Sequence, residues 1–150
     1  MSLKAQIESD IKKAMLSKNK QELLALRAIK SAILIAETEK GAGGSLSHEA
    51  EVMLLMKAVK QRKDSAEVYQ AQSRQDLADK ELAELEVINR YLPEQMSEDK
   101  LREELKLIIE KYGASSPADM GKVMGIATKQ FAGKADGKTI SILVRSLLSN

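Results

Sequence analysis

The sequence has 150 residues but no cysteine, no tryptophan and a single histidine, His48. Without cysteine the chain cannot form a disulfide framework, a thiol nucleophile, an iron–sulfur site or a zinc site built from cysteine and histidine. One imidazole without a serine partner and an orienting acid also makes no catalytic triad. We therefore expect no catalytic residues, no metal site and no cofactor, and we interpret His48 as a solvated residue near a helix start.

Long apolar runs are missing as well. No stretch approaches the roughly 18 apolar residues that a membrane-spanning helix requires. The first twenty residues mix acidic and basic side chains with apolar ones, unlike a signal peptide or an acid-poor transit peptide. The sequence therefore predicts no membrane association and a cytosolic location.

An excess of one charge is also absent, because 24 Lys and Arg residues stand against 22 Asp and Glu residues. The net charge of +2 indicates no particular partner, so a nucleic-acid surface would have to come from local clustering. Such a cluster follows Gly113, where five basic residues face only Asp119 and Asp136. The five are Lys122, Lys129, Lys134, Lys138 and Arg145.

Apolar residues recur at intervals of three and four along the whole chain, and no stretch alternates as a strand would. We therefore predict an all-α fold, with about four longer helices followed by three shorter ones. Side chains that can cap a helix start stand at Ser47, Ser97, Ser116 and Asp136. Breaks are predicted at GAGGS (residues 41–45), Ser73, Pro93, Gly113 and Gly133.

The main boundary is predicted between Pro93 and Ser97, where a proline that ends one helix is followed by a cap that begins the next. The segments on either side each contain a complete set of apolar stripes. We predict a helical core at residues 1–94 and a small three-helix tail domain at residues 97–150.

Gly121 and Gly125 lie on the same predicted helix as Lys122 and Lys129, and the two lysines share the face opposite the apolar stripe. Each glycine costs a helix up to about 1 kcal/mol relative to alanine. Close approach of another backbone can compensate for that cost. The sequence leaves two alternatives, a neighbouring helix or the backbone of a bound ligand.

The motif GKADGKT, residues 133–139, falls short of a phosphate-binding loop because Ala132 stands where that motif needs its first glycine. A turn between two helices is the simpler interpretation. The amides that begin the last helix, next to Lys134 and Lys138, can still hold one phosphate oxygen of a larger ligand.

Arg62 falls on the apolar stripe of the third predicted helix. One interpretation is structural: the stem packs in the core and the guanidinium pairs with a carboxylate such as Asp64, Glu67 or Asp76. The other is that Arg62 binds a protein partner.

Several segments of the chain resemble the YqeY-like proteins of the GatB/YqeY family. They read KQRKDSAEVYQAQSRQDLADKELAEL at residues 60–85, YLP at 91–93, DMGKVMG at 119–125 and GKADGKTISILVRSLL at 133–148. The first part of the chain resembles the helical YqeY core. The part from about Ser97 resembles the tail of the B subunit of the glutamine-dependent aspartyl/glutamyl-tRNA amidotransferase.

This resemblance implies a two-part helical protein with a tail related to one that meets tRNA. It also implies a family label of carbon–nitrogen ligase with glutamine as the amide donor. The domains that perform this chemistry in the amidotransferase have no counterpart among these 150 residues. The resemblance therefore favours a tRNA-linked module over a self-sufficient ligase.

Our leading hypothesis is an accessory module that binds the backbone of a folded tRNA through the five basic tail residues and the Gly121 and Gly125 face. Aromatic residues make up only 3% of the chain, too few for a platform that stacks single-stranded bases. The alternative is a protein-interaction adaptor that docks through the acidic middle helices and Arg62.

Overall fold

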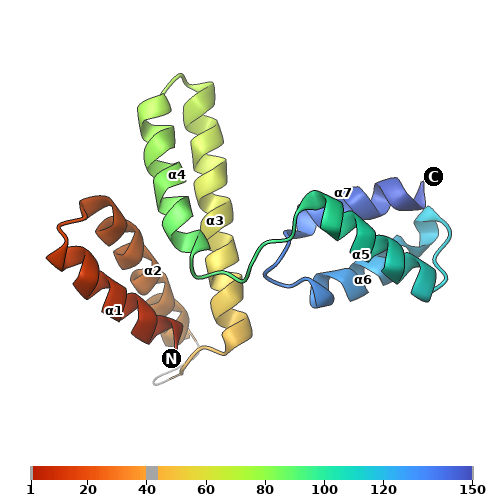
Figure 1. Ribbon diagram of the computed structural model, residues 1–150, viewed down its shortest axis with the longest axis horizontal. Helices are drawn as coiled ribbons and strands as arrows, with labels where there is room; N and C mark the ends of the chain where they lie inside the picture. Colours follow the sequence, from red (N-terminus) through yellow and green to blue (C-terminus); the bar gives the residue numbers. More distant parts are fainter. Residues whose placement is uncertain (1, 40–43, 150) are drawn as a thin grey trace. The chain divides into compact units, whose positions relative to one another are not determined.

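A computed structural model describes residues 2–39 and 44–149. Within these ranges every regular element is helical, which confirms the predicted all-α fold (Figure 1). The elements are α1 (Leu3–Leu16), α2 (Lys20–Glu39), α3 (His48–Ala71), α4 (Gln75–Asn89), α5 (Glu98–Lys111), the 3₁₀ turn η1 (Pro117–Asp119), α6 (Met120–Gln130) and α7 (Gly137–Leu148).

The chain divides into two compact units, which we call unit 1 (Met1–Leu92) and unit 2 (Pro93–Asn150). Each unit encloses its own cluster of buried apolar side chains. Pro93 and the three residues after it thus belong to unit 2. Among the described residues no helix has the length and apolar character needed to cross a bilayer.

Unit 1 consists of two helical hairpins, α1 with α2 and α3 with α4, and α2 packs against α4 (Figure 1). The most deeply buried large side chains are Ile7, Leu26, Ile29, Ile33, Leu55 and Ile88. At the rim of this core the Tyr91 hydroxyl donates a hydrogen bond to Asp10. Burial, followed by this bond to Asp10, raises the pKa of Tyr91 above its usual range.

Unit 2 is built from α5, α6 and α7, which contribute Leu101, Leu105, Val123, Ile140 and Val144 to one core. The sequence predicted a continuous helix from Ser116, and that prediction is wrong for its first turn. Pro117–Asp119 form a 3₁₀ turn instead, because the Asp119 carboxylate accepts the Ser115 and Ser116 amides and holds the chain tightly wound.

Three of the predicted caps are observed directly. The Ser47 and Ser97 hydroxyls accept the Ala50 and Lys100 amides at 3.1 and 3.2 Å, and Asp136 caps α7. His48 is exposed at the first residue of α3, as expected. The predicted GAGGS break falls mostly on residues 40–43, which lie outside the described ranges; α2 ends at Glu39 before them and α3 begins after them.

Candidate nucleic-acid interface

The solvent face of α6 carries both glycines and two of the five basic residues. Val123 and Ala127 are fully buried, and on a helix of 3.6 residues per turn Gly125 and Lys129 lie almost opposite them. Gly121, Lys122, Gly125 and Lys129 are all exposed. The backbone of α6 is therefore accessible between two lysines.

No part of the described structure packs into this face. A methyl group placed at Gly121 or at Gly125 would meet no atom within 4 Å apart from the helix itself. Of the two explanations for these glycines, close approach of a neighbouring helix thus has no support in the described residues. Close approach of a ligand backbone remains a prediction.

A second basic face lies on α7. Lys138 and Arg145 are exposed on the side opposite Ile140 and Val144. Between them stands Ile142, which is 56% exposed. This face therefore combines two cations with an apolar side chain.

Lys134 lies in the turn between α6 and α7, apart from both helix faces. It lines a cavity of about 550 Å³ together with Glu94, Gln95, Met96, Ser97, Lys100, Glu104, Gln130 and Phe131. The Met96 amide donates to the Lys134 carbonyl at 2.9 Å, and the Gln95 side-chain amide donates to the Gly133 carbonyl at 2.6 Å. The turn is thus fixed by the segment that precedes α5.

The start of α7, where the sequence indicated a phosphate contact, is already occupied by a carboxylate. Asp136 accepts the Thr139 amide at 2.6 Å, so that amide is not available to a phosphate. The negative charge of Asp136 also opposes an anion at this helix end. Lys138 and Lys134 remain exposed on either side of it.

Few carboxylates pair with the five basic residues. Asp136 aside, no Asp or Glu among the residues that the structure describes forms an ion pair with any of the five. The Ser115 and Ser116 amides lower the pKa of the Asp119 carboxyl below its usual range, and the charge of Lys122 has a smaller effect in the same direction. Asp119 and Asp136 both accept backbone amides, so the segment after Gly113 keeps exposed positive charge.

Tyr112 is a candidate that sequence reasoning missed. The intervals of three and four that join Leu101, Leu105 and Ile108 continue to Tyr112 and predict a core residue there, yet Tyr112 is 40% exposed. The ammonium groups of Lys111 and Lys122 lie 5.6 and 5.9 Å from the centre of its ring. Tyr112 directly follows α5 and precedes Gly113, and this position at a helix end was the signal that it could lie outside the core.

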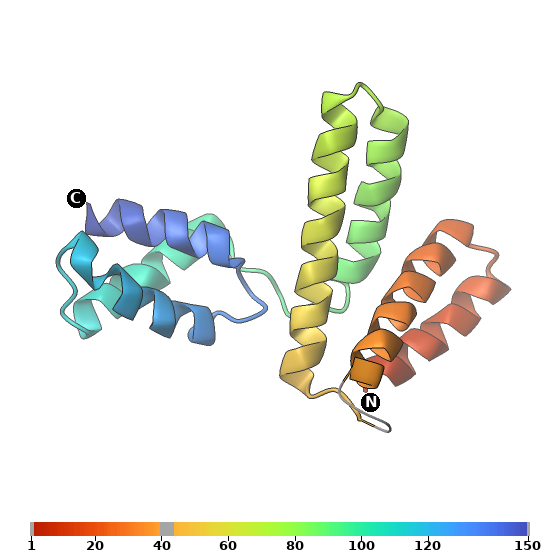
Figure 2. The ribbon, with the colours of Figure 1, turned by 180° about the vertical axis from the view of Figure 1, so that it is seen from behind.

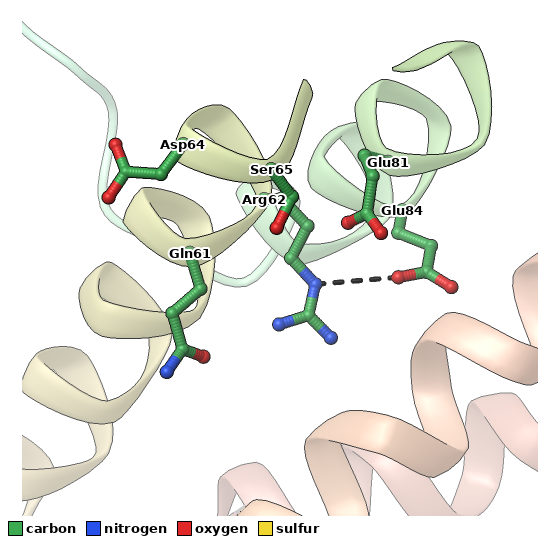
Figure 3. Close-up of a pocket in the computed structure, with 6 residues that line it drawn as sticks. All are labelled: Gln61, Arg62, Asp64, Ser65, Glu81 and Glu84. Carbon is green, nitrogen blue, oxygen red and sulfur yellow. Dashed lines mark ion pairs between the residues drawn. The ribbon is translucent and has the colours of Figure 1, made fainter. Parts of the chain in front are cut away.

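Arg62 is in unit 1 and has a different environment. Its Nε lies 3.4 Å from Oε2 of Glu84, and the side chain is mostly buried (Figure 3). The predicted partners Asp64, Glu67 and Asp76 are therefore wrong, because the α3–α4 hairpin places Glu84 across from Arg62. Asp76 instead pairs with Arg74 at 3.0 Å.

The Arg62 guanidinium borders a cavity of about 550 Å³, lined by Gln61, Arg62, Asp64, Ser65, Glu81 and Glu84. Figure 3 shows Glu81 and Glu84 reaching toward Arg62 from α4. Although Nε is within ion-pair distance of Glu84, its hydrogen has no well-aligned acceptor. No cluster of three or more candidate metal ligands occurs in the part of the chain that the structure describes.

Comparison with known proteins gives one family match and several relatives. The family model described as "Yqey-like protein" matches residues 4–148. A protein of Clavispora lusitaniae named "Altered inheritance of mitochondria protein 41, mitochondrial" is 34% identical over 116 residues, which cover 76% of this chain and 66% of that protein. The protein of the same name from Pyrenophora tritici-repentis is 30% identical over 145 residues, covering 95% and 78% of the two chains.

A third relative of the same name, from Lachancea thermotolerans, is 35% identical over 88 residues, or 59% of this chain and 46% of that protein. The chain thus spans about half to three quarters of the length of these relatives. Their names place them in mitochondria, which contradicts the cytosolic location predicted from the sequence. That prediction is wrong because it relied on the composition of the first twenty residues, and the composition of a folded helix does not determine the location of a protein.

Proposed function

This chain belongs to the YqeY-like family, and we propose that it acts as a module that binds the phosphate backbone of a folded RNA, such as tRNA, through α6 and α7 of unit 2. The observation that carries the proposal is that Lys122, Lys129, Lys134, Lys138 and Arg145 are all exposed. Phosphate contacts of this kind need positive charge on the surface and no dedicated cavity.

The geometry of α6 supports the proposal. Lys122 and Lys129 are seven residues apart, so they lie two turns, or about 10 Å, from each other on the same side of the helix. Gly121 and Gly125 leave no side chain on the surface next to them. A sugar–phosphate chain can therefore approach the helix backbone closely while each lysine reaches a phosphate.

The resemblance of the tail to the tail of the tRNA amidotransferase B subunit also supports RNA as the ligand class. We do not propose the ligase chemistry of that enzyme for this chain. We propose recognition of RNA shape and backbone, since an exposed cationic surface of this kind reads phosphates rather than base edges.

The test is a titration of labelled tRNA at two salt concentrations. Binding should weaken steeply as salt rises, with a slope that increases with the number of phosphates contacted. A Lys122→Glu, Lys129→Glu double variant should bind at least about tenfold more weakly, because each phosphate contact is lost and replaced by repulsion.

The matched control is Lys106→Glu, an exposed lysine on the more acidic helix α5. It should change the affinity by about twofold or less, through the overall charge alone. No tRNA binding at low salt would refute the proposal. An equal loss in the Lys106 variant would show that binding is nonspecific and is not located on α6.

A second candidate function is docking of a protein partner at the Arg62 cavity. The observation that favours it is a mostly buried guanidinium whose Nε hydrogen has no well-aligned acceptor at the edge of an open cavity. With Asp64, Glu81 and Glu84 on the same rim, the cavity suits a polar side chain that both accepts from Arg62 and donates to the carboxylates.

A pull-down from nuclease-treated extract separates the two functions. The adaptor function predicts a partner that survives nuclease and is lost on Arg62→Ala. Arg74→Ala is the control, since Arg74 also forms an ion pair with a carboxylate but lies exposed at the α3–α4 turn. Loss of the partner from both variants, or from neither, would argue against docking at this cavity.

A further inference from the structure

Helix α2 is apolar on two opposite faces. Ala25, Leu26, Ile29 and Ile33 are buried in the core of unit 1. On the other side Leu24 and Ile35 are each 61% exposed and Leu34 is 42% exposed. Helices that are apolar all round are normally buried on all sides. In Figure 2 this helix, in orange, lies nearer to the viewer than α1, and no other helix of unit 1 crosses in front of it.

The exposed face has a palindromic order of residue types. Its members are Lys20, Gln21, Leu24, Ala28, Ser31, Ile35, Thr38 and Glu39, and Leu34 lies just outside it. At 100° per residue they fall within an arc of about 100°. Read from either end, the order is charged, polar, large apolar, small, small, large apolar, polar, charged. A contact surface that meets an identical copy across a two-fold axis needs this kind of symmetry.

The same symmetry pairs each residue type with its counterpart when two α2 helices pack antiparallel. With the two-fold axis midway between Ile29 and Lys30, Leu24 lies opposite Ile35 of the second copy, and Ala28 lies opposite Ser31 of the second copy. The small residues at the centre allow the two helix backbones to approach closely, and the large ones on each side cover the contact.

The two end charges supply an independent indication. Lys20 is the first residue of α2 and Glu39 is the last, so each opposes the helix dipole. Neither forms an ion pair with a residue that the structure describes. In the same antiparallel register Lys20 lies opposite Glu39 of the second copy, so two reciprocal ion pairs form at the ends of the contact.

We infer that α2 is a dimerisation helix, whose exposed face packs in antiparallel fashion on the same face of a second copy of this chain. The inference rests on a surface of unit 1 and is independent of the proposed RNA contact on unit 2. The occupant is a second copy because the charges and side-chain sizes are self-complementary, whereas a different partner would not require this register.

Sedimentation velocity of the nuclease-treated protein, measured from low to high micromolar concentration, tests the inference. We expect a reversible monomer–dimer equilibrium. Ile35→Glu should leave a monomer at every concentration, because two buried carboxylates would face apolar side chains across the axis. Met53→Glu is the matched control, since Met53 is 71% exposed on α3, and it should dimerise like the parent.

Charge reversal at Lys20 and Glu39 tests whether the partner of α2 is a second copy of this chain. Lys20→Glu or Glu39→Lys alone should raise the dimer dissociation constant by about tenfold, because two ion pairs become two like-charge contacts. The Lys20→Glu, Glu39→Lys double variant should return to the parent value. Each single variant should melt at or above the parent temperature when monomeric, because the reversal agrees with the helix dipole.

Three results would overturn the inference. They are a parent protein that stays monomeric at all concentrations, a Met53→Glu variant that dissociates as readily as Ile35→Glu, and a double charge reversal that does not restore the dimer. If the double charge reversal does not restore the dimer but Ile35→Glu still prevents dimerisation, this face of α2 forms the contact and the proposed antiparallel register is wrong.

Discussion

Units 1 and 2 use their charged side chains in different ways. In unit 1 the ion pairs Lys4–Glu37, Lys30–Glu8 and Arg62–Glu84 each join two different helices, and Arg90, the residue after α4, pairs with Glu22 of α2. In unit 2 the ion pair Arg102–Glu98 lies within one helix, α5. Exposed ion pairs contribute little to stability. The different use of ion pairs therefore matters mainly for the surface, because exposed Lys and Arg side chains of unit 2 remain accessible to a ligand.

The two units also differ in how their helices are stabilised. Helix α3 has 24 residues, whereas α6 and α7 have 11 and 12. Helices as short as α6 and α7 are marginal on their own, so they depend on a shared core and on capped ends. Unit 2 should accordingly be more sensitive than unit 1 to the loss of a single core side chain or a single cap.

The largest effect is expected from a core truncation in each unit. Leu105→Ala removes a fully buried side chain from unit 2 and should cost about 2–5 kcal/mol. A unit of this size is stable by only about 3–9 kcal/mol, so this substitution should remove roughly half of the stability of unit 2.

Ile29→Ala is the matched truncation in unit 1, where the side chain is 2% exposed. Hydrogen exchange measured segment by segment should show loss of protection only in the unit that carries the substitution. Loss of protection in both units from either variant would mean that the two fold as one cooperative body.

A smaller effect is expected from the caps. Ser97→Ala and Ser47→Ala each remove a hydroxyl that accepts an amide at the third helical position, so each should cost about 1 kcal/mol. In thermal melts followed by circular dichroism, the Ser97 variant should lower the melting temperature of its unit more than the Ser47 variant does. Equal shifts would contradict the greater dependence of unit 2 on its caps.

The smallest expected effect is an increase in the stability of unit 2. Gly125→Ala should stabilise unit 2 by up to about 1 kcal/mol, because the new methyl group meets no atom within 4 Å and alanine favours the helix. Gly113→Ala should destabilise it by about 1 kcal/mol although the space there is equally open, because Gly113 has a φ of +65°.

Thermal melts of the two glycine variants check the sign of each change. If α6 contacts RNA, Gly125→Ala should also weaken tRNA binding, while Gly113→Ala should not. A Gly125→Ala protein that melts higher and binds tRNA as the parent does would remove this face from the proposed interface.

The helices and most of their ends could be predicted because they depend on local signals. A serine followed by a carboxylate, as at Ser97, or a glycine that ends an apolar stripe, as at Gly113, acts within one turn of the chain. The residues that share a face of α6 also follow from the helical period alone.

What could not be predicted depends on contacts between helices. The partner of Arg62 is Glu84, 22 residues along the chain, and is selected by the packing of α3 on α4. The segment between Pro93 and Ser97 was predicted only as a boundary, yet at Gln95 and Met96 it is hydrogen-bonded to the α6–α7 turn. Neither contact leaves a signal in the local sequence.

The bond between Tyr91 and Asp10 has a consequence for the order in which unit 1 forms. It joins residues 81 positions apart, and α4, which supplies Val87 and Ile88 to the core, is the last helix of the unit. At a synthesis rate of about 5–20 residues per second, α4 emerges roughly 3–16 s after α1. During that interval the side chains of α2 that pack against α4 are uncovered, so the nascent chain exposes apolar side chains on two faces of α2 at once.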